Sequence, residues 1–236
     1  MNARQGFIGQ SVERREDSRF LTGKGQYTDD ISLPGQTHAF FLRSPYAHAR
    51  ITSIDTSAAA KAPGVVGILT GDHFKAVGGL PCGWLINSLD GQPMKEPKHP
   101  VLADGKVRYV GDRVALVVAE TLDQAAAAAE LIVVDYEELT PVVDALTAPQ
   151  IASSVHDEAP DNRVYQWGIG DKDGTATALA GAAHVSTLTY RNNRLIPNAM
   201  EPRCANASYD VNADNYTLYV ANQNPHVERL LMCAFV

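Results

Sequence analysis

Gln223 is the polar residue whose place in the sequence best suits a chemical role. It follows the segment 216–222 (YTLYVAN), which contains the predicted strand 216–220, and precedes Pro225, a residue that favours the first position of a helix. Gln223 is therefore expected in a strand-to-helix turn, where side chains and helix N-terminal N–H groups can face a ligand, especially an anionic one. The alternative, an ordinary turn residue without a functional role, stays open.

The cysteines and histidines do not form a recognisable metal or redox site. Cys82, Cys204 and Cys233 are odd in number, far apart and never in a C-x-x-C pair. This pattern is typical of reduced thiols in a cytosolic protein. The seven histidines occur singly, and for His48 and His226 we favour a hydrogen-bonded structural role over metal ligation or base catalysis. No metal ligand is predicted.

Two short charged motifs have ordinary interpretations. The segment 171–174 (DKDG) resembles the start of a calcium loop but lacks the later ligands, so we predict a turn. In 201–203 (EPR) a carboxylate and a guanidinium can meet, and we favour an ion pair that holds a strand end. The sequence contains no phosphate-binding P-loop, no G-x-G-x-x-G after a strand, no G-x-S-x-G and no H-E-x-x-H. No catalytic residue is predicted.

The composition excludes several classes of protein. The 236 residues allow one large domain or two small ones, and 45% are hydrophobic. Lys+Arg minus Asp+Glu is 20 − 27 = −7, without a basic block, so nucleic-acid binding is not expected. No apolar run reaches the roughly 18–20 residues that span a bilayer, and the N-terminus lacks the apolar region of a secretory signal. We expect a cytoplasmic protein without a transmembrane segment.

The first part of the chain predicts short strands with few helices. Residues 37–54 are extended with a break at 44–45, and 65–69 is a further strand. Residues 77–100 form a long loop, a type that often binds partners. Strand 113–119, helix 122–132 with Thr121 as its N-cap, and strand 133–136 give a βαβ-like or split α/β unit.

The composition changes after residue 144. Residues 145–162 are rich in Pro, Ser, Asp and Ala, which indicates a linker. Strands are predicted at 185–191, 205–210 and 216–220, the last two joined by a turn at 212–215. The helix that starts at Pro225 has an apolar stripe formed by Val227, Leu230, Leu231, Ala234 and Phe235. This stripe needs a cover, so we expect either a continuing chain or a partner.

Several segments in the same order resemble the large subunit of molybdenum hydroxylases, the family of xanthine dehydrogenase, aldehyde oxidase and aerobic carbon monoxide dehydrogenase. The resemblance covers nearly the whole chain from about residue 9. The segments WGIGDKDG and QNPH are similar in sequence to those of the bacterial branch that includes carbon monoxide dehydrogenase. The matching segments are LTGKGQYTDDI, FLRSPYAHARITSIDTS, VRYVGDRVALVVAETLDQAAAAAELIVVDYEEL, DNRVYQWGIGDKDG, NAMEPR and YTLYVANQNPHVERLL.

This resemblance implies an α+β fold in which an α/β hammerhead domain precedes the start of a mixed α/β molybdopterin-binding domain. The implied boundaries are a lead-in at 1–17, the hammerhead at 18–145, a linker at 146–162 and the beginning of the molybdopterin-binding domain at 163–236. The family's glycine-rich loop beside the metal, its substrate loop and its general-base glutamate do not occur in these residues. We therefore expect these 236 residues alone to be inactive.

The resemblance also implies a cofactor, partners and a reaction. Gln223 matches a family glutamine whose amide donates a hydrogen bond to an oxo ligand of molybdenum. The complete subunit would hold molybdenum on molybdopterin cytosine dinucleotide. A medium subunit would carry FAD and a small subunit two 2Fe-2S clusters, in a dimer of heterotrimers.

The complete enzyme would be an oxidoreductase that inserts water-derived oxygen into a small-molecule substrate, or that oxidises carbon monoxide. An alternative function of another class is a stand-alone, non-catalytic hammerhead module for binding or assembly.

Overall fold

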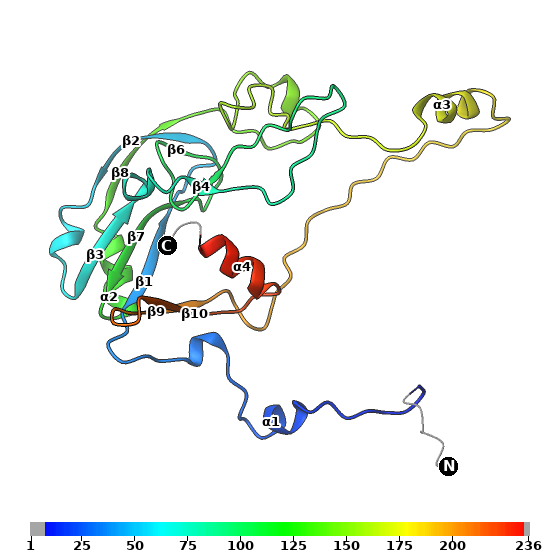
Figure 1. The fold of residues 1–236 in the computed structure, drawn as a ribbon. Coiled ribbons are helices and arrows are strands. Elements are labelled where there is room, and N and C mark those ends of the chain that lie inside the picture. The colour runs from blue at the N-terminus through cyan, green and yellow to red at the C-terminus, as the bar shows by residue number, and fades with distance from the viewer. Residues whose placement is uncertain (1–7, 234–236) are drawn as a thin grey trace, which may run out of the picture. The chain divides into compact units, whose positions relative to one another are not determined.

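The computed structural model describes residues 8–233, which separate into two compact units (Figure 1). The larger unit is formed by Gln36–Asn192. The smaller unit joins the residues up to Gly35 with Asn193–Met232, so two distant parts of the sequence build it. Each unit has its own sheets and is described by itself.

A three-stranded antiparallel sheet in the order β1-β7-β3 forms one half of the larger unit. Its strands are β1 (His38–Arg43), β3 (Val65–Thr70) and the central β7 (Arg113–Ala119). All three lie where the sequence predicts strands. β7 is almost entirely apolar because it pairs on both edges and has little exposed surface: four of its seven residues are buried.

A second antiparallel sheet has the order β6-β2-β8 and consists of β2 (Ala49–Asp55), β6 (Lys106–Val107) and β8 (Val133–Glu138). Helix α2 (Leu122–Ala129) leads from β7 in the first sheet to β8 in the second. The predicted order of strand, helix and strand is confirmed. The βαβ alternative, which needs parallel strands in one sheet, is wrong because β7 and β8 lie in different sheets.

Small side chains let α2 pack closely on the first sheet. The N-terminus of α2 is closed by Thr121, whose Oγ1 accepts a hydrogen bond from the Gln124 N–H at 3.2 Å while Gln124 Oε1 accepts one from the Thr121 N–H at 3.0 Å. The buried alanines of α2 then contact alanines and a valine of β7. This core consists of Ala59, Ala115, Val117, Ala119, Ala125, Ala128, Ala129 and Ile132.

The long loop predicted at 77–100 contains local structure. Residues 86–94 form a tight hairpin, in which the Met94 N–H donates to the Ile86 carbonyl at 3.0 Å. The Leu89 N–H also donates to the Gln166 carbonyl at 2.9 Å. The remaining short elements of the larger unit are η2 (Ala59–Lys61), η3 (Gly71–Phe74), β4 (Gly79–Leu80), β5 (His99–Pro100) and η4 (Ala148–Gln150).

Two predictions for residues 163–192 are wrong. Residues 185–191 were expected to form a strand, but they lie in neither helix nor strand. The predicted turn at 171–174 is instead the beginning of helix α3 (Lys172–Ala180). The Gly174 N–H donates to Asp171 Oδ1 at 2.8 Å, so this aspartate caps the helix.

The smaller unit is built around the hairpin of β9 (Ala205–Asp210) and β10 (Asn215–Val220). Both strands and their turn were predicted. The rings of Tyr209 and Tyr216 stack across the hairpin with their centroids 4.4 Å apart. The N-terminal residues of this unit contain α1 (Asp17–Leu21) and η1 (Thr28–Asp30).

Helix α4 (Pro225–Met232) follows the hairpin and begins at the predicted proline. Two side chains of its apolar stripe are open to solvent, Val227 at 46% and Leu230 at 71% exposed, whereas Leu231 is half-buried. Ala234 and Phe235, the other end of the predicted stripe, lie outside the described residues. Between residues 8 and 233, no helix combines the length and apolar character that crossing a membrane requires.

Candidate functional site

Gln223 lies in the four-residue turn between β10, which ends at Val220, and α4, which begins at Pro225. Its neighbours shape this turn. The Asn224 N–H donates to Asn222 Oδ1 at 2.5 Å, and Asn222 Nδ2 donates to Glu228 Oε2 at 3.0 Å. The side chain of Gln223 is exposed and makes no hydrogen bond within residues 8–233. Its amide is therefore available to an external group.

A primary amide suits a ligand that carries negative charge on oxygen. It offers two N–H donors and one carbonyl acceptor, and it does not titrate. It can thus donate a hydrogen bond without adding a full charge to the site. The predicted strand-to-helix turn is confirmed as the position of Gln223, whereas its contact with a cofactor stays a prediction.

The N-terminal residues hold the end of the hairpin from which this turn emerges. Asn206 Nδ2 donates to the Ile31 carbonyl at 2.8 Å, and the Thr28 N–H donates to Glu201 Oε1 at 3.0 Å. Glu201 thus bonds to backbone, and no ion pair between Glu201 and Arg203 occurs in the described structure, so the predicted pair is wrong. The carboxylate accepts a backbone donor that the fold brings within reach.

Cys204 lies beside this contact and is held as a thiol. Partial burial raises its pKa, and the neighbouring Asp29 carboxylate, 3.6 Å from the sulfur, raises it further. A protonated thiol is a poor nucleophile and a poor metal ligand. All three cysteines are free, and the described residues include no group of three or more His, Cys, Asp or Glu side chains that could hold a metal ion.

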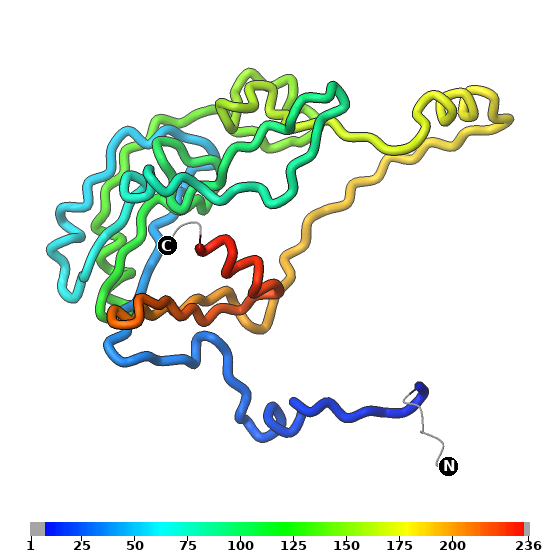
Figure 2. The backbone as a smooth tube through the Cα atoms, viewed as in Figure 1, coloured from blue at the N-terminus to red at the C-terminus, as the bar shows by residue number. Residues whose placement is uncertain are grey.

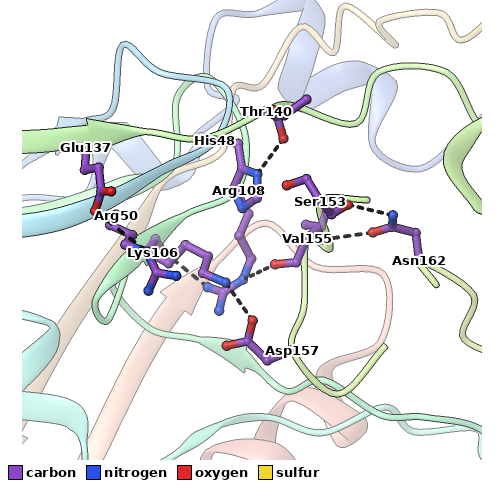
Figure 3. A network of polar contacts seen from close by, with 10 residues as sticks. All are labelled: His48, Arg50, Lys106, Arg108, Glu137, Thr140, Ser153, Val155, Asp157 and Asn162. Atoms are coloured by element: carbon purple, nitrogen blue, oxygen red, sulfur yellow. Dashed lines mark hydrogen bonds and ion pairs between the residues drawn. The ribbon is translucent and has the colours of Figure 1, made fainter. Parts of the chain in front are cut away.

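A polar network in the larger unit fastens residues 148–162 to the second sheet (Figure 3). Lys106 Nζ on β6 bonds to Asp157 Oδ1 at 2.8 Å. The lysine side chain is only 10% exposed, whereas the aspartate side chain is 81% exposed. The hydrogen bond from Lys106 holds the pKa of Asp157 below its usual range. Arg108 Nε donates to the Val155 carbonyl at 3.3 Å.

The side chain of Asn162 holds the same segment together through hydrogen bonds to its backbone. Its backbone adopts a left-handed conformation with φ of 55°. Its Oδ1 accepts a hydrogen bond from the Val155 N–H at 2.9 Å, and its Nδ2 donates to the carbonyls of Ser153 and Ala148 at 2.9 and 3.0 Å. Sequence reasoning treated this segment as a linker and missed the network, because its partners are 51 residues apart for Lys106 and Asp157.

His48 has the structural role predicted from the sequence. It is 2% exposed, and its Nδ1 lies 2.9 Å from the Thr140 carbonyl oxygen, to which it donates in the tautomer protonated at Nδ1 (Figure 3). His226 is exposed at the start of α4.

Comparison with known proteins gives these observations a family context. Residues 22–140 match the model of the aldehyde oxidase and xanthine dehydrogenase a/b hammerhead domain, which is half of the chain. Residues 155–236 match the model of the molybdopterin cofactor-binding domain. The chain belongs to the aldehyde oxidase and xanthine dehydrogenase family. The family and the α+β hammerhead fold expected from the sequence are thereby confirmed, and Gln223 lies in the part matched by the second model.

Individual family members align along almost the whole chain. The large subunit of nicotine 6-hydroxylase from Paenarthrobacter nicotinovorans is 38% identical over 97% of the chain and 28% of its own length. The large chain of carbon monoxide dehydrogenase from Afipia carboxidovorans is 37% identical over 95% of the chain and 28% of its own length.

Among solved structures, quinoline 2-oxidoreductase from Pseudomonas putida 86 is similar with a TM-score of 0.82 and 34% identity. The match covers 98% of the present chain and 29% of the quinoline 2-oxidoreductase chain. The chain thus spans less than a third of the length of these relatives.

Proposed function

We propose that the chain is part of the molybdopterin-binding large subunit of a molybdenum hydroxylase. This enzyme inserts water-derived oxygen into a small-molecule substrate or oxidises carbon monoxide. The observation that carries the proposal is the match to a hammerhead model followed by a molybdopterin cofactor-binding model, in one chain and in this order. The names of the relatives, a hydroxylase, a dehydrogenase and an oxidoreductase, support the same reaction class.

Gln223 is the residue that we assign to the cofactor. Its amide is exposed and unbonded in the described chain, and the hydrogen bonds of Asn222 and Asn224 fix the turn on either side. These features fit a donor aimed at an oxygen atom of the cofactor, which in the proposed holoenzyme is molybdenum on molybdopterin cytosine dinucleotide. When bound, this group supplies the redox chemistry. Gln223 contributes a neutral hydrogen-bond donor that stabilises negative charge on that oxygen.

Two described groups near the turn, Glu228 and Cys204, already have other roles. Glu228 Oε2 accepts a hydrogen bond from Asn222, so this carboxylate has a structural task. Cys204 remains protonated because burial and Asp29 raise its pKa. We propose that the proton acceptor for the reaction comes from other parts of the large subunit, and we expect these 236 residues alone to show no turnover.

The proposed organisation follows the family. Residues 1–17 are a lead-in, 18–145 the hammerhead domain, 146–162 the connection, and 163–236 the beginning of the molybdopterin-binding domain. We further propose a cytoplasmic dimer of heterotrimers with an FAD-binding medium subunit and a small subunit carrying 2Fe-2S clusters. The relatives are named as a large subunit and a large chain, which supports smaller partners.

The test is to express the complete gene product together with the neighbouring subunit genes and to measure its metal and nucleotide. We expect one molybdenum per large subunit, release of a cytosine nucleotide on acid hydrolysis, and substrate-dependent reduction of a dye acceptor. A gene that stops after Val236 and yields a stable monomer without molybdenum would overturn the proposal and favour a stand-alone hammerhead module.

A further inference from the structure

Residues 185–191 (VSTLTYR) are extended (Figure 2), and within residues 8–233 they have no partner strand. In the described part of the chain, no backbone N–H of these residues donates a hydrogen bond, and none of their carbonyls accepts one. The one side-chain contact is between Ser186 Oγ and His184 Nε2 at 3.0 Å. The backbone therefore offers a row of free donors and acceptors.

The sequence of this segment is that of a half-buried strand. Valine, threonine and tyrosine are favoured in strands. Side chains alternate between two faces, so Ser186, Leu188 and Tyr190 share one face, and the other carries Val185, Thr187, Thr189 and Arg191. Leu188 is 83% exposed and Tyr190 is 81% exposed. Two large apolar side chains on one face of an unpaired strand indicate a surface that is covered in the complete protein.

We propose that residues 185–191 add as a strand to a sheet edge formed by the part of the large subunit outside these 236 residues, with Leu188 and Tyr190 facing that part's core. This inference rests on the proposed function. The length of the relatives argues for this occupant, because the chain spans only 28% of the two large subunits. Most of such a subunit therefore lies outside the described residues and can supply the edge.

Strand addition satisfies both features of the segment at once. The free N–H and carbonyl groups pair with the edge strand, and alternate side chains enter pockets, as in other cases of β-augmentation. The extended conformation also lowers the entropic cost of ordering the segment. A flat apolar surface would cover Leu188 and Tyr190 but would leave the backbone groups unpaired.

Hydrogen exchange of the complete enzyme tests the strand. In this enzyme, amide exchange at 186–191 should be slower by about 100-fold or more than in an unstructured peptide of the same sequence, as expected for sheet amides that open only by sub-global unfolding. A molybdenum-loaded, active enzyme in which these amides exchange as fast as in that peptide would overturn the inference while leaving the proposed function intact. Absence of molybdenum from the complete enzyme would instead overturn the proposed function.

Photo-cross-linking of the holoenzyme identifies the occupant. The substitution Tyr190→p-benzoylphenylalanine places the probe on the proposed buried face, and Thr189→p-benzoylphenylalanine is the matched control on the opposite face. We expect the Tyr190 probe to react with residues beyond 236 of the same polypeptide, without a change in the mass of the denatured subunit. Attachment to the medium or small subunit, or doubling of the large-subunit mass, would overturn the proposed occupant.

Discussion

Replacing Gln223 by alanine should separate catalysis from folding. The side chain is exposed and has no partner in the described chain, so its removal should change the free energy of unfolding by no more than about 0.5 kcal/mol. In the holoenzyme, loss of a hydrogen bond to a charged oxygen costs about 1.5–3 kcal/mol. Because about 1.4 kcal/mol corresponds to a tenfold change in rate, kcat should fall about 10- to 150-fold.

The measurement is steady-state turnover of the complete enzyme, normalised to bound molybdenum, together with urea unfolding of the same preparation. Asn222→Ala is the comparison variant, because it keeps the Gln223 side chain but removes the hydrogen bonds to Asn224 and Glu228 that hold its turn. That variant should lose stability in the turn. Unchanged kcat at normal molybdenum content in Gln223→Ala would refute the assignment of Gln223 to the cofactor.

Three further predictions concern the larger unit. Ala128→Leu should destabilise it by about 1–3 kcal/mol through overpacking, whereas the exposed Ala127→Leu on the same helix should have almost no effect; equal shifts in the urea midpoint would contradict the packing of α2. Asn162→Ala should cost about 2–3 kcal/mol because it loses three hydrogen bonds and the tolerance of positive φ, and Asn162→Gly should cost less; thermal unfolding that ranks the two variants the other way would be inconsistent with the observed backbone. Burial, followed by the charge of Arg108, lowers the pKa of His156 below its usual value of about 6.5. The unfolded chain therefore binds this proton more tightly than the folded protein does, and the stability contribution of neutral His156 is lost as the pH falls below about 6.5. Urea midpoints should fall less between pH 7 and pH 5 in His156→Asn than in the unsubstituted protein, and parallel pH profiles would argue against this.

The elements that could be predicted from the sequence are those with a strong local signal. β7 is a continuous apolar run, Thr121 with Gln124 forms a capping box, and Pro225 opens α4. Each signal acts within a few residues, so no knowledge of the tertiary fold is needed. The turn that holds Gln223 follows directly from two such neighbouring elements.

The features that could not be predicted depend on distant partners or lack an apolar periodicity. α3 has no buried residue, so its sequence lacks the hydrophobic stripe that would predict a helix. Its capping residue Asp171 is equally typical of a turn. Lys106 and Asp157 are brought together only by the packing of β6 against the later segment. Residues 185–191 have the right pattern for a strand, but a strand also requires a neighbour, and the described chain supplies none.

The sequence boundaries of the family match and the structural units do not coincide, and this difference bears on Gln223. Residues 22–35 fall within the hammerhead match, yet they belong to the smaller unit. There the Ile31 carbonyl accepts a hydrogen bond from Asn206, which pairs with Tyr219 across the hairpin. Gln223 lies four residues after Tyr219. The N-terminal segment therefore bonds to the end of the hairpin from which the turn with Gln223 continues. The hammerhead sequence thus contributes its first residues to the support of the proposed cofactor-binding turn.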